Sequence, residues 1–315
     1  MYVLGIETSC DETAASVVKD GKEILSNIVS SSLRLHKRYG GVIPEIASRM
    51  QLETITKVVD SAIKEAGIGL KSIDRIAVTD SPGLLGSLLV GTSFAQALSL
   101  ALHTPLLGID HVYSHIYANF LNGQNIKLPV VALVASGGHT SLFYVKDFKK
   151  IETLGQTQDD ACGEAFDKVA KILGLGYPGG PVIEALAKKG NSKKIKFRCS
   201  GTKAALNFSF SGIKTAVLYY VNRQTGKPAN AQTNDICASF QEAVVNTLVN
   251  KTLLAARLKK VKRIVVGGGV AANNYLRQRF YKEAKIAGIN CYFPPKSLCA
   301  DNAAMVAGLG YQLLK

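Results

Sequence analysis

The sequence lacks paired cysteines. Its six cysteines are scattered along 315 residues, and none forms a C-x-x-C pair. A disulfide framework is therefore not expected in a chain of this length, and a thiol zinc site is not indicated. Reduced thiols in a cytosolic protein are the simplest interpretation of this pattern.

The sequence also lacks a recognisable targeting segment and a clear membrane span. Its first residues, MYVLGIETSC, have no basic region followed by an apolar stretch, so a signal peptide is not expected. The closest approach to a span is LLGSLLVGTSFAQALSLAL (84–102), whose Gly, Ser, Thr and Gln residues favour a buried helix instead. We therefore expect a cytoplasmic protein with no membrane partner.

Acidic residues are scarce relative to basic ones. The chain has 38 Lys and Arg residues against 23 Asp and Glu residues, which gives a formal net charge of +15. A soluble protein with solvated basic faces explains this balance about as well as a polyanion partner such as RNA or DNA. The densest basic segment is KKGNSKKIKFR (188–198), and RLKKVKR (257–263) comes next.

A repeated order of strand and helix patterns runs through the chain. Residues 2–21 and 128–147 each show a strand, a small-residue turn and a second strand, and both end at Lys-Asp. Helical patterns follow each of them, as in residues 44–67, which begin near Pro44 and end at Gly67. The chain length suits two compact lobes, so we predict an α/β protein with a duplicated core.

Glycine-rich turns follow two short strands of β-branched residues. They are ASGGHTS (135–141) and VGGGVAANN (266–274). Glycine lets the backbone approach a ligand closely, and backbone N–H groups at such turns bind phosphate. Neither turn matches a P-loop or a G-x-G-x-x-G motif, and either one alone would be an ordinary tight turn. Together with ETSCDET after the first strand, they favour a nucleotide site between two lobes.

His111 and His115 stand four residues apart in DHVYSHIYAN, so on a helix they share one face. This spacing suits two imidazole ligands on one metal ion, although chance alone can produce it. A zinc peptidase needs Glu directly after the first His, where this chain has Val112. Asp301, near the start of the last predicted helix, is a plausible third ligand, and an ordinary helix-capping role is the alternative.

Two further side chains are candidates for the chemistry. Asp167 lies on a predicted helix in GEAFDKVAKILGLGYPGGP (163–181). Its carboxylate could accept a hydrogen bond from a sugar hydroxyl, and an ordinary solvent-exposed helix face is the alternative. His139, in SGGHT, lies close to the predicted phosphate turn and is a candidate general base. A turn histidine bonded to the backbone is the alternative.

Several segments together resemble the tRNA threonylcarbamoyladenosine transferase family, formerly called O-sialoglycoprotein endopeptidase. They follow the family's order through nearly the whole chain, and CDET together with the lack of a fused kinase domain resembles the bacterial form. The segments are GIETSCDET, GGVIPEIASR, PGLLGSLLVG, DHVYSHIYA, SGGHT, DDACGEAFDKVAKILGLGYPGGP, FSFSGIKTAV, GGGVAANNYLR and CADNAAM.

The resemblance implies an actin-like ATPase fold, shared with sugar kinases and Hsp70, in two lobes with a central cleft. It places the N-terminal lobe at residues 1–127, the C-terminal lobe at 128–300, and a last helix, 301–315, that packs back on the first lobe. It implies an acyltransferase that moves a threonylcarbamoyl group from threonylcarbamoyl-AMP to the exocyclic amine of the adenosine beside the anticodon. The tRNAs read codons starting with A, and AMP is released.

The resemblance also implies ligands and partners. His111, His115 and Asp301 match the family's metal ligands, for one divalent ion per subunit, more often iron than zinc. Threonylcarbamoyl-AMP, or ATP or AMP, would occupy the cleft. Beside tRNA, the bacterial family works with an inactive paralogue of the same fold and a small ATPase. The nucleotide-binding positions fall on Val134, Ala135, Ser136, Gly137, Gly138, Asp167, Gly180 and Asn273.

Two positions depart from the family's usual pattern. Ala135 replaces a more common Val beside the phosphate turn, where contacts are mostly made by backbone, so little effect is expected. Glu184 stands near a position that is often Asp in bacterial members, and whether it contacts the nucleotide sugar stays open. A sugar kinase or chaperone of the same superfamily, a zinc peptidase and a non-catalytic scaffold are the alternative functions.

Overall fold

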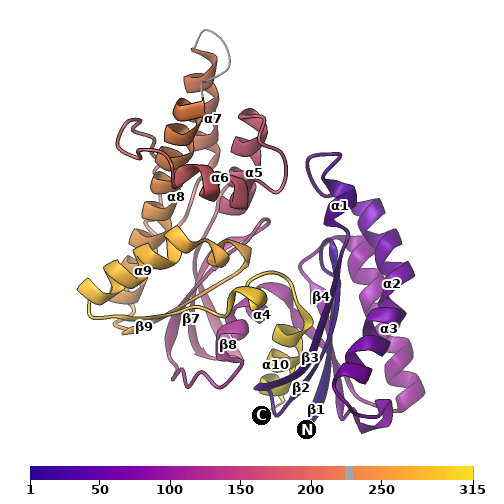
Figure 1. Ribbon diagram of the computed structural model, residues 1–315. Coiled ribbons are helices and arrows are strands. Elements are labelled where there is room, and N and C mark those ends of the chain that lie inside the picture. The colour runs from indigo at the N-terminus through magenta and orange to yellow at the C-terminus, as the bar shows by residue number, and fades with distance from the viewer. Residues whose placement is uncertain (224–229, 315) are drawn as a thin grey trace. The chain divides into compact units, whose positions relative to one another are not determined.

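A computed structural model describes residues 1–223 and 230–314 (Figure 1). The chain forms two compact units, Met1–Lys127 with Pro294–Lys315, and Leu128–Phe293. The chain thus returns to the first unit at Pro294, whereas the resemblance put this boundary at residue 301. Residues 224–229 and 315, which fall within two of the predicted segments, lie outside the described residues.

A five-stranded mixed sheet, in the order β3-β2-β1-β4-β5, forms the core of the first unit. The β1–β2 and β2–β3 pairs are antiparallel, and the β1–β4 and β4–β5 pairs are parallel. An Asp-Gly dipeptide between two strand patterns predicts a hairpin turn, and Asp20 and Gly21, with φ angles of 52° and 70°, form the turn between β2 and β3. The strands are β1 (Tyr2–Glu7), β2 (Glu12–Lys19), β3 (Glu23–Ser31), β4 (Arg75–Ser81) and β5 (Leu106–Asp110).

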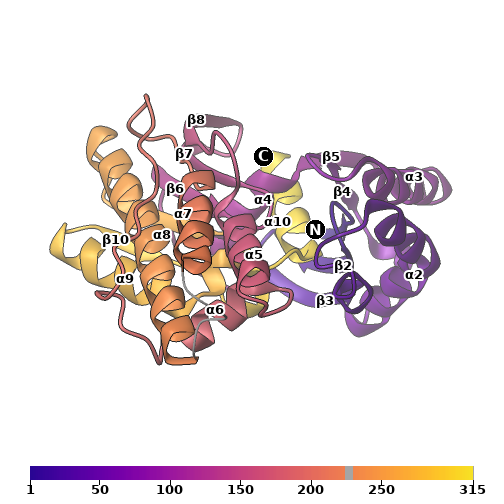
Figure 2. The same cartoon turned by 90° about the horizontal axis from the view of Figure 1, so that it is seen from above.

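Helices cover both faces of this first sheet. The pair α2 and α3 packs on one face, and α10 with α4 packs on the other (Figures 1 and 2). The helix predicted over 44–67 is confirmed, since α2 has Pro44 in its first turn and Gly67, with φ of 65°, just after its end. The helices are α1 (Leu33–His36), α2 (Pro44–Glu65), α3 (Leu85–Leu102), α4 (His111–Tyr117) and α10 (Ala303–Leu313).

Helix α3 is apolar but is not the buried helix that its composition predicts. It is long and apolar enough to cross a membrane, yet only 17% of it is buried. Its small residues Ser87, Gly91 and Ala95 face inward, while Leu85 and Leu89 are 77% and 56% exposed. A narrow stripe of small side chains lets the helix approach its neighbours and leaves its leucines outside.

The second unit repeats the topology of the first. Its sheet has the order β10-β9-β6-β7-β8, so β6 takes the central place that β1 holds in the first sheet. The β6–β7 and β7–β8 pairs are antiparallel, and the β6–β9 and β9–β10 pairs are parallel. The predicted duplication of the core is confirmed. The strands are β6 (Val130–Ala135), β7 (Thr140–Asp147), β8 (Lys150–Gln156), β9 (Arg263–Gly267) and β10 (Asn290–Tyr292).

One cap in the second unit comes from a distant segment. The DDACGEAF pattern predicts that an Asp caps α5, but the N-cap of α5 is Ala161, and the carboxylate of Asp159 accepts hydrogen bonds from the N–H groups of Phe210 and Ser211, at the start of α7. A cap from a distant segment leaves no local sequence signal. The helices are α5 (Cys162–Ile172), α6 (Gly179–Ala187), α7 (Ser211–Asn222), α8 (Asn230–Leu258) and α9 (Asn274–Ile286).

Candidate metal centre and nucleotide cavity

Helix α4 begins directly after β5 and carries both histidines of the HxxxH pair. The Asp110 side chain caps it by accepting a hydrogen bond from the Tyr113 N–H at 2.8 Å. One helical turn separates His111 from His115, so both imidazoles project from the same face, with ring centroids 4.7 Å apart. Both side chains are buried.

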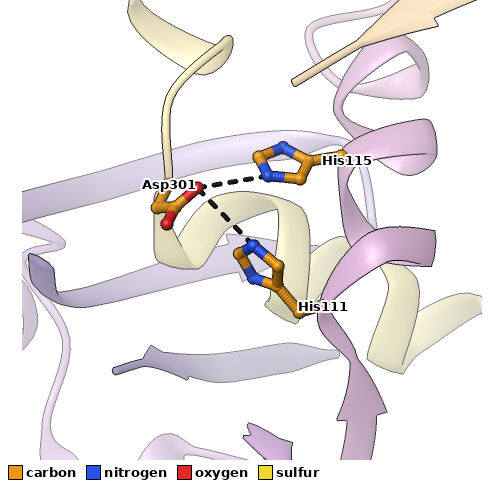
Figure 3. A group of neighbouring side chains, drawn as sticks. All are labelled: His111, His115 and Asp301. Carbon is orange, nitrogen blue, oxygen red and sulfur yellow. Dashed lines mark ion pairs between the residues drawn. The ribbon is translucent and has the colours of Figure 1, made fainter. Parts of the chain in front are cut away.

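Asp301 reaches the two imidazoles from the loop before α10. Its Oδ1 lies 3.1 Å from His115 Nε2 and 3.6 Å from His111 Nε2 (Figure 3). The cap of α10 is Asn302, whose side chain accepts from the Met305 N–H, so the capping alternative for Asp301 is wrong. The structure brings together two imidazoles and a carboxylate, with one ligand atom from each lying within 4.8 Å of the others.

The surroundings of these three side chains fit a cation. His115 has no exposed surface, and within the described residues neither of its ring nitrogens makes a hydrogen bond. Burial and the nearby negative charges of Asp301 and Asp11 raise the pKa of Glu12 to about 10. A divalent ion would give His115 Nε2 a partner and relieve this gathering of carboxylates. The group therefore fits a metal site, and an N₂O donor set is compatible with zinc or iron.

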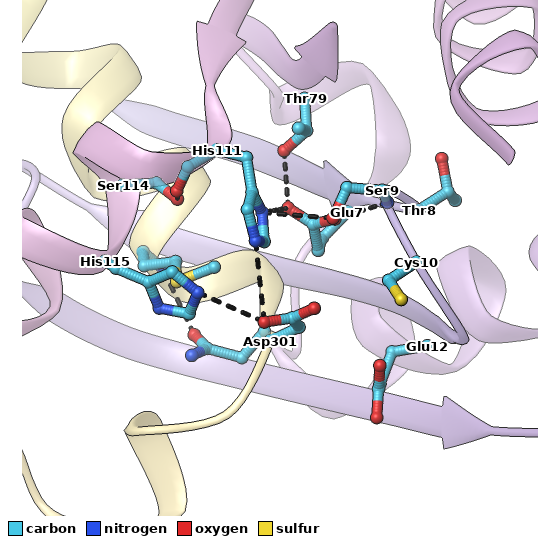
Figure 4. A network of polar contacts seen from close by, with 12 residues as sticks. Glu7, Thr8, Ser9, Cys10, Glu12, Thr79, His111, Ser114, His115 and Asp301 are labelled. Atoms are coloured by element: carbon cyan, nitrogen blue, oxygen red, sulfur yellow. Dashed lines mark hydrogen bonds and ion pairs between the residues drawn. The ribbon is translucent and has the colours of Figure 1, made fainter. Parts of the chain in front are cut away.

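Sequence reasoning missed Glu7, which lies against this group (Figure 4). Its Oε2 is 3.1 Å from His111 Nδ1, on the far side of the ring from Asp301. Burial by itself would raise the pKa of Glu7, but the adjacent His111 outweighs it and holds that pKa below its ordinary value. Burial would lower the pKa of His111, but the negative charges of Glu7 and Asp301 outweigh it and raise that pKa to about 9. Its sequence signal is its place as the first residue of ETSCDET, at the end of an apolar strand.

A cavity of about 230 Å³ in the second unit collects residues from both predicted glycine turns. Four of the predicted nucleotide-binding residues line it, namely Gly137, Asp167, Gly180 and Asn273. Glu184, which the sequence left open, lines it too. Sequence reasoning did not single out the remaining lining residues, which are Gly163, Phe166, Pro178, Pro181, Gly269, Val270 and Ala272.

The other predicted nucleotide-binding residues lie beside the cavity without lining it. Val134 and Ala135 end β6 and have no exposed surface. Ser136 closes the turn, since its N–H donates to the His139 carbonyl and its Oγ accepts from the His139 N–H. Gly138 stands where a side chain would meet open space. The backbone of His139 is thus fixed in the turn, while its side chain is partly buried.

One close approach and one backbone angle explain why glycines are needed around this cavity. The Gly163 N–H donates to the Ser136 carbonyl at 3.2 Å, and a Cβ on Gly163 would lie 2.5 Å from that oxygen. Gly268 has a φ of 89°, a conformation that disfavours other residues. The cavity therefore depends on backbone segments that lie closer than side chains would allow.

Comparison with known proteins identifies the family. The family model described as tRNA N6-adenosine threonylcarbamoyltransferase matches residues 23–308. A protein of that name from Caldicellulosiruptor saccharolyticus is 51% identical over 311 residues, covering 99% of this chain and 92% of the relative. Another from Clostridium kluyveri is 50% identical over 313 residues, with the same coverage. The chain belongs to this family.

Members of the tRNA N6-adenosine threonylcarbamoyltransferase family modify tRNA, and this chain is a transferase that moves a threonylcarbamoyl group to adenosine 37. The family match favours transfer over the kinase, peptidase and scaffold alternatives. The substrate tRNA is a polyanion, which suits the net charge of +15 of the transferase.

Solved structures support the fold of the transferase. Full-length HypF, in a phosphate- and nucleotide-bound form, is 15% identical with a TM-score of 0.64, covering 100% of this chain and 46% of that one. Component A of Acidaminococcus fermentans (R)-2-hydroxyglutaryl-CoA dehydratase is 18% identical with a TM-score of 0.59, covering 99% and 98%. Both show the fold alone, and the predicted actin-like ATPase fold is confirmed.

Proposed function

We propose that the acyl donor is threonylcarbamoyl-AMP and that the acceptors are tRNAs reading codons that start with A. The observation that carries this proposal is the buried group of His111, His115 and Asp301, because the chemistry of acyl transfer benefits from a cation near the reacting carbonyl. The glycine-lined cavity of the second unit supports an adenylate as the donor, since its backbone can approach phosphate and sugar closely.

His111, His115 and Asp301 are the proposed ligands of one divalent metal, iron or zinc. Such an ion would supply Lewis acidity and positive charge for the acyl group and the departing phosphate. The protein's part is to hold the ligands in place. Helix α4 fixes the two imidazoles at one spacing, and the loop before α10 brings Asp301 to them.

The proposed nucleotide site uses the cavity residues of the second unit. Gly137 and Gly138 would present backbone to the phosphate, with Val134, Ala135 and Ser136 setting the strand and turn behind them. Asp167 accepts a hydrogen bond from the Gly179 N–H at 2.7 Å, which leaves its other oxygen for a sugar hydroxyl beside Gly180. Asn273 also lines the cavity, although its amide donates to Gln241 and its oxygen accepts from the Leu276 N–H.

The transfer itself exchanges one bond for another. The N6 amine of adenosine 37 attacks the carbamoyl carbonyl, the carbonyl bond to the phosphate oxygen breaks, and AMP leaves with that electron pair. The amine loses one proton. His139, in the turn that ends at the phosphate loop, is the proposed acceptor of this proton.

The proposed protein partners are an inactive paralogue of the same fold and a small ATPase. A groove between α2 and α3 supports the paralogue. Leu52 and Leu89 line this groove and are 69% and 56% exposed, which suits a protein contact better than solvent. Such a contact also accounts for the apolar exposed face of α3 in a protein proposed to work in the cytoplasm. The small ATPase stays a prediction from the family resemblance.

A transfer assay with purified components tests the proposal. Labelled threonylcarbamoyl-AMP, unmodified tRNA and the partner proteins are mixed with wild type, with His115→Ala, or with the surface control Asp60→Asn. We expect label in tRNA with wild type and the control, and a loss of about two orders of magnitude or more with His115→Ala. Transfer by His115→Ala at the wild-type rate would overturn the metal assignment, and failure of wild type with this donor would overturn the donor.

A further inference from the structure

Glu7 is a carboxylate without exposed surface at the end of β1. The Ser9 N–H donates to its Oε1 at 2.5 Å, and the Thr79 hydroxyl donates to its Oε2 at 2.5 Å. Burying a carboxylate is costly, so its oxygens need hydrogen-bond donors and its charge needs to be offset by a basic group or a cation nearby. Within the described residues, the one basic side chain that pairs with Glu7 is His111.

The Glu7–His111 contact has a defined direction. Glu7 Oε2 lies 3.1 Å from His111 Nδ1, while His111 Nε2 faces Asp301 Oδ1 at 3.6 Å (Figure 4). The imidazole therefore has a carboxylate on each side, one behind it in the core and one at the candidate metal centre. An ionised carboxylate can only accept a hydrogen bond, so Glu7 places the imidazole hydrogen on Nδ1 and leaves the Nε2 lone pair for a metal.

A second group competes for the same nitrogen. The Ser9 hydroxyl is also 3.1 Å from His111 Nδ1. A hydroxyl can either donate or accept, so it does not choose between the two imidazole tautomers. If Ser9 were the relevant partner, the tautomer would be unfixed. This makes Ser9 a matched comparison for Glu7, with equal distance and different chemistry.

We infer that Glu7 is a positioning residue for the metal centre, which acts by holding His111 as the tautomer that ligates through Nε2. A carboxylate behind a ligating imidazole fixes the ring and raises its basicity, and losing such a partner typically costs about 10- to 100-fold in metal affinity. The inference rests on the proposed ligand role of His111 and is independent of the acyl donor.

Cobalt(II) affinity of the purified full chain, followed by its visible absorption, tests this inference. We expect Glu7→Gln to bind cobalt about 10- to 100-fold more weakly than wild type, because an amide can donate to Nδ1 as readily as it accepts. Ser9→Ala should bind like wild type. Equal affinity of Glu7→Gln and wild type would overturn the role of Glu7, as would an equal loss in Ser9→Ala.

If Glu7→Gln does not fold, a measurement on the wild-type protein tests the inference instead. Nitrogen-15 chemical shifts of the zinc-loaded protein distinguish a protonated Nδ1 with a ligating Nε2 from the reverse arrangement. The first result supports the inference, and ligation through Nδ1 overturns it. If wild type binds neither cobalt nor zinc, the metal assignment fails together with it. If wild type binds metal and His115→Ala does not, but Glu7→Gln does, only the role of Glu7 fails.

A basic surface in the second unit carries an independent inference. The turn between β7 and β8 lies at the end of the sheet where β6 begins, since Val145 pairs with Val130. The loop after α8, which leads into β9, lies at the same end, since Lys259 forms an ion pair with Glu152 of β8. Tyr144 lies under Lys259, whose Nζ is 5.1 Å from the ring centre. We call this surface the basic edge, and its residues are Lys146, Lys149, Lys150, Lys259, Lys260 and Lys262.

The charge of the basic edge is largely uncompensated. Among the described residues, Lys259 pairs with Glu152, but Lys146, Lys150 and Lys260 form no ion pair. Tyr144, Lys146, Lys150 and Lys259 also line a hollow of about 470 Å³. Exposed lysines around a shallow hollow with an aromatic floor suit a phosphate backbone.

We propose that the basic edge docks phosphates of the substrate tRNA away from the reacting adenosine. The edge lies at the opposite end of β6 from the Gly137 turn, which a six-residue strand puts about 20 Å away. Contacts at that separation would hold stem phosphates rather than the base that reacts. This inference rests on tRNA being the substrate and on the proposed donor site at the Gly137 turn, and it is independent of the metal.

Charge reversal tests the basic edge. The triple variant Lys146→Glu, Lys150→Glu, Lys260→Glu is compared with the triple variant Lys22→Glu, Lys57→Glu, Lys71→Glu, which changes the net charge equally elsewhere. We expect tRNA affinity to fall and the slope of log K against log salt to shrink by about 0.9 per lost phosphate contact in the first variant only. Equal losses in both variants, or none in the first, would overturn the docking role. A lost affinity for an acidic partner protein with unchanged tRNA binding would assign the edge to that protein instead.

Discussion

Asp301 Oδ1 lies 3.1 Å from His115 Nε2, while the adjacent Asn302 caps α10. Asn302 thus caps the helix and Asp301 contacts the histidines, whereas the sequence alone does not show which of the two residues has which role. Asn302 stabilises the start of α10, and the carboxylate of Asp301, one residue before it, lies against the imidazoles. This division makes the pair suitable for separating a structural effect from a metal-binding effect.

Asp301→Asn should lose the metal while keeping the fold. The amide has the same shape but no negative charge to offset a divalent ion. Metal content of the purified protein, measured by mass spectrometry, should drop well below one ion per chain. Asn302→Ala is the comparison, with metal retained and the free energy of unfolding lowered by about 1–2 kcal/mol through the lost cap. Equal metal content in Asp301→Asn and wild type would contradict the assignment.

Asp159→Asn should destabilise the second unit in a pH-dependent way. Burial would raise the pKa of Asp159, but hydrogen bonds from Ser209, Phe210 and Ser211 outweigh it and lower that pKa. A lowered folded-state pKa adds stability that is fully present above the ordinary value of 3.8 and is lost as the pH falls through the folded value.

The measurement is urea unfolding of wild type and Asp159→Asn across pH. We expect a difference of about 1 kcal/mol at neutral pH, typical of a helix cap, which shrinks towards zero in acid below the folded pKa. Asp60→Asn, on an exposed helix face, serves as the control with little change. A difference that grows on acidification would contradict the sign of this effect.

Gly163→Ala should damage the nucleotide cavity. The new Cβ would lie 2.5 Å from the Ser136 carbonyl oxygen, so the helix and the glycine turn must separate. We expect a loss of about 1–3 kcal/mol in unfolding free energy and weaker AMP binding by calorimetry. Gly201→Ala is the matched control, because a Cβ there meets nothing within 4 Å. Wild-type AMP affinity in Gly163→Ala would show that the cavity tolerates this separation.

Leu89→Glu should prevent binding of the proposed paralogue without unfolding the chain. Leu89 is 56% exposed on α3, so a charged side chain there keeps its access to water. We expect unchanged thermal stability and loss of the complex in size-exclusion chromatography with the purified paralogue. Ile286→Glu, at a residue 74% exposed on α9, should leave that complex intact. A complex that survives Leu89→Glu would remove the α2–α3 groove as the contact.

Local sequence patterns determined much of the fold of this protein. The helix between Pro44 and Gly67, the turn at Asp20 and Gly21, and the repeated strand order all appear where the residues predict them. Each depends on neighbours in the chain, through caps, φ preferences and periodicity. The spacing of His111 and His115 belongs to the same class, since a single helical turn fixes it.

The tertiary structure decided which distant residues meet. No local pattern places Asp301 beside the histidines, Glu7 behind His111, or Asp159 at the start of α7. The exposure of Leu85 and Leu89 was equally unreadable, because an apolar helix looks the same in sequence whether its leucines face a core or a surface. These outcomes depend on how the sheet brings far segments together, and that is set by the packing of the whole unit rather than by any stretch of it.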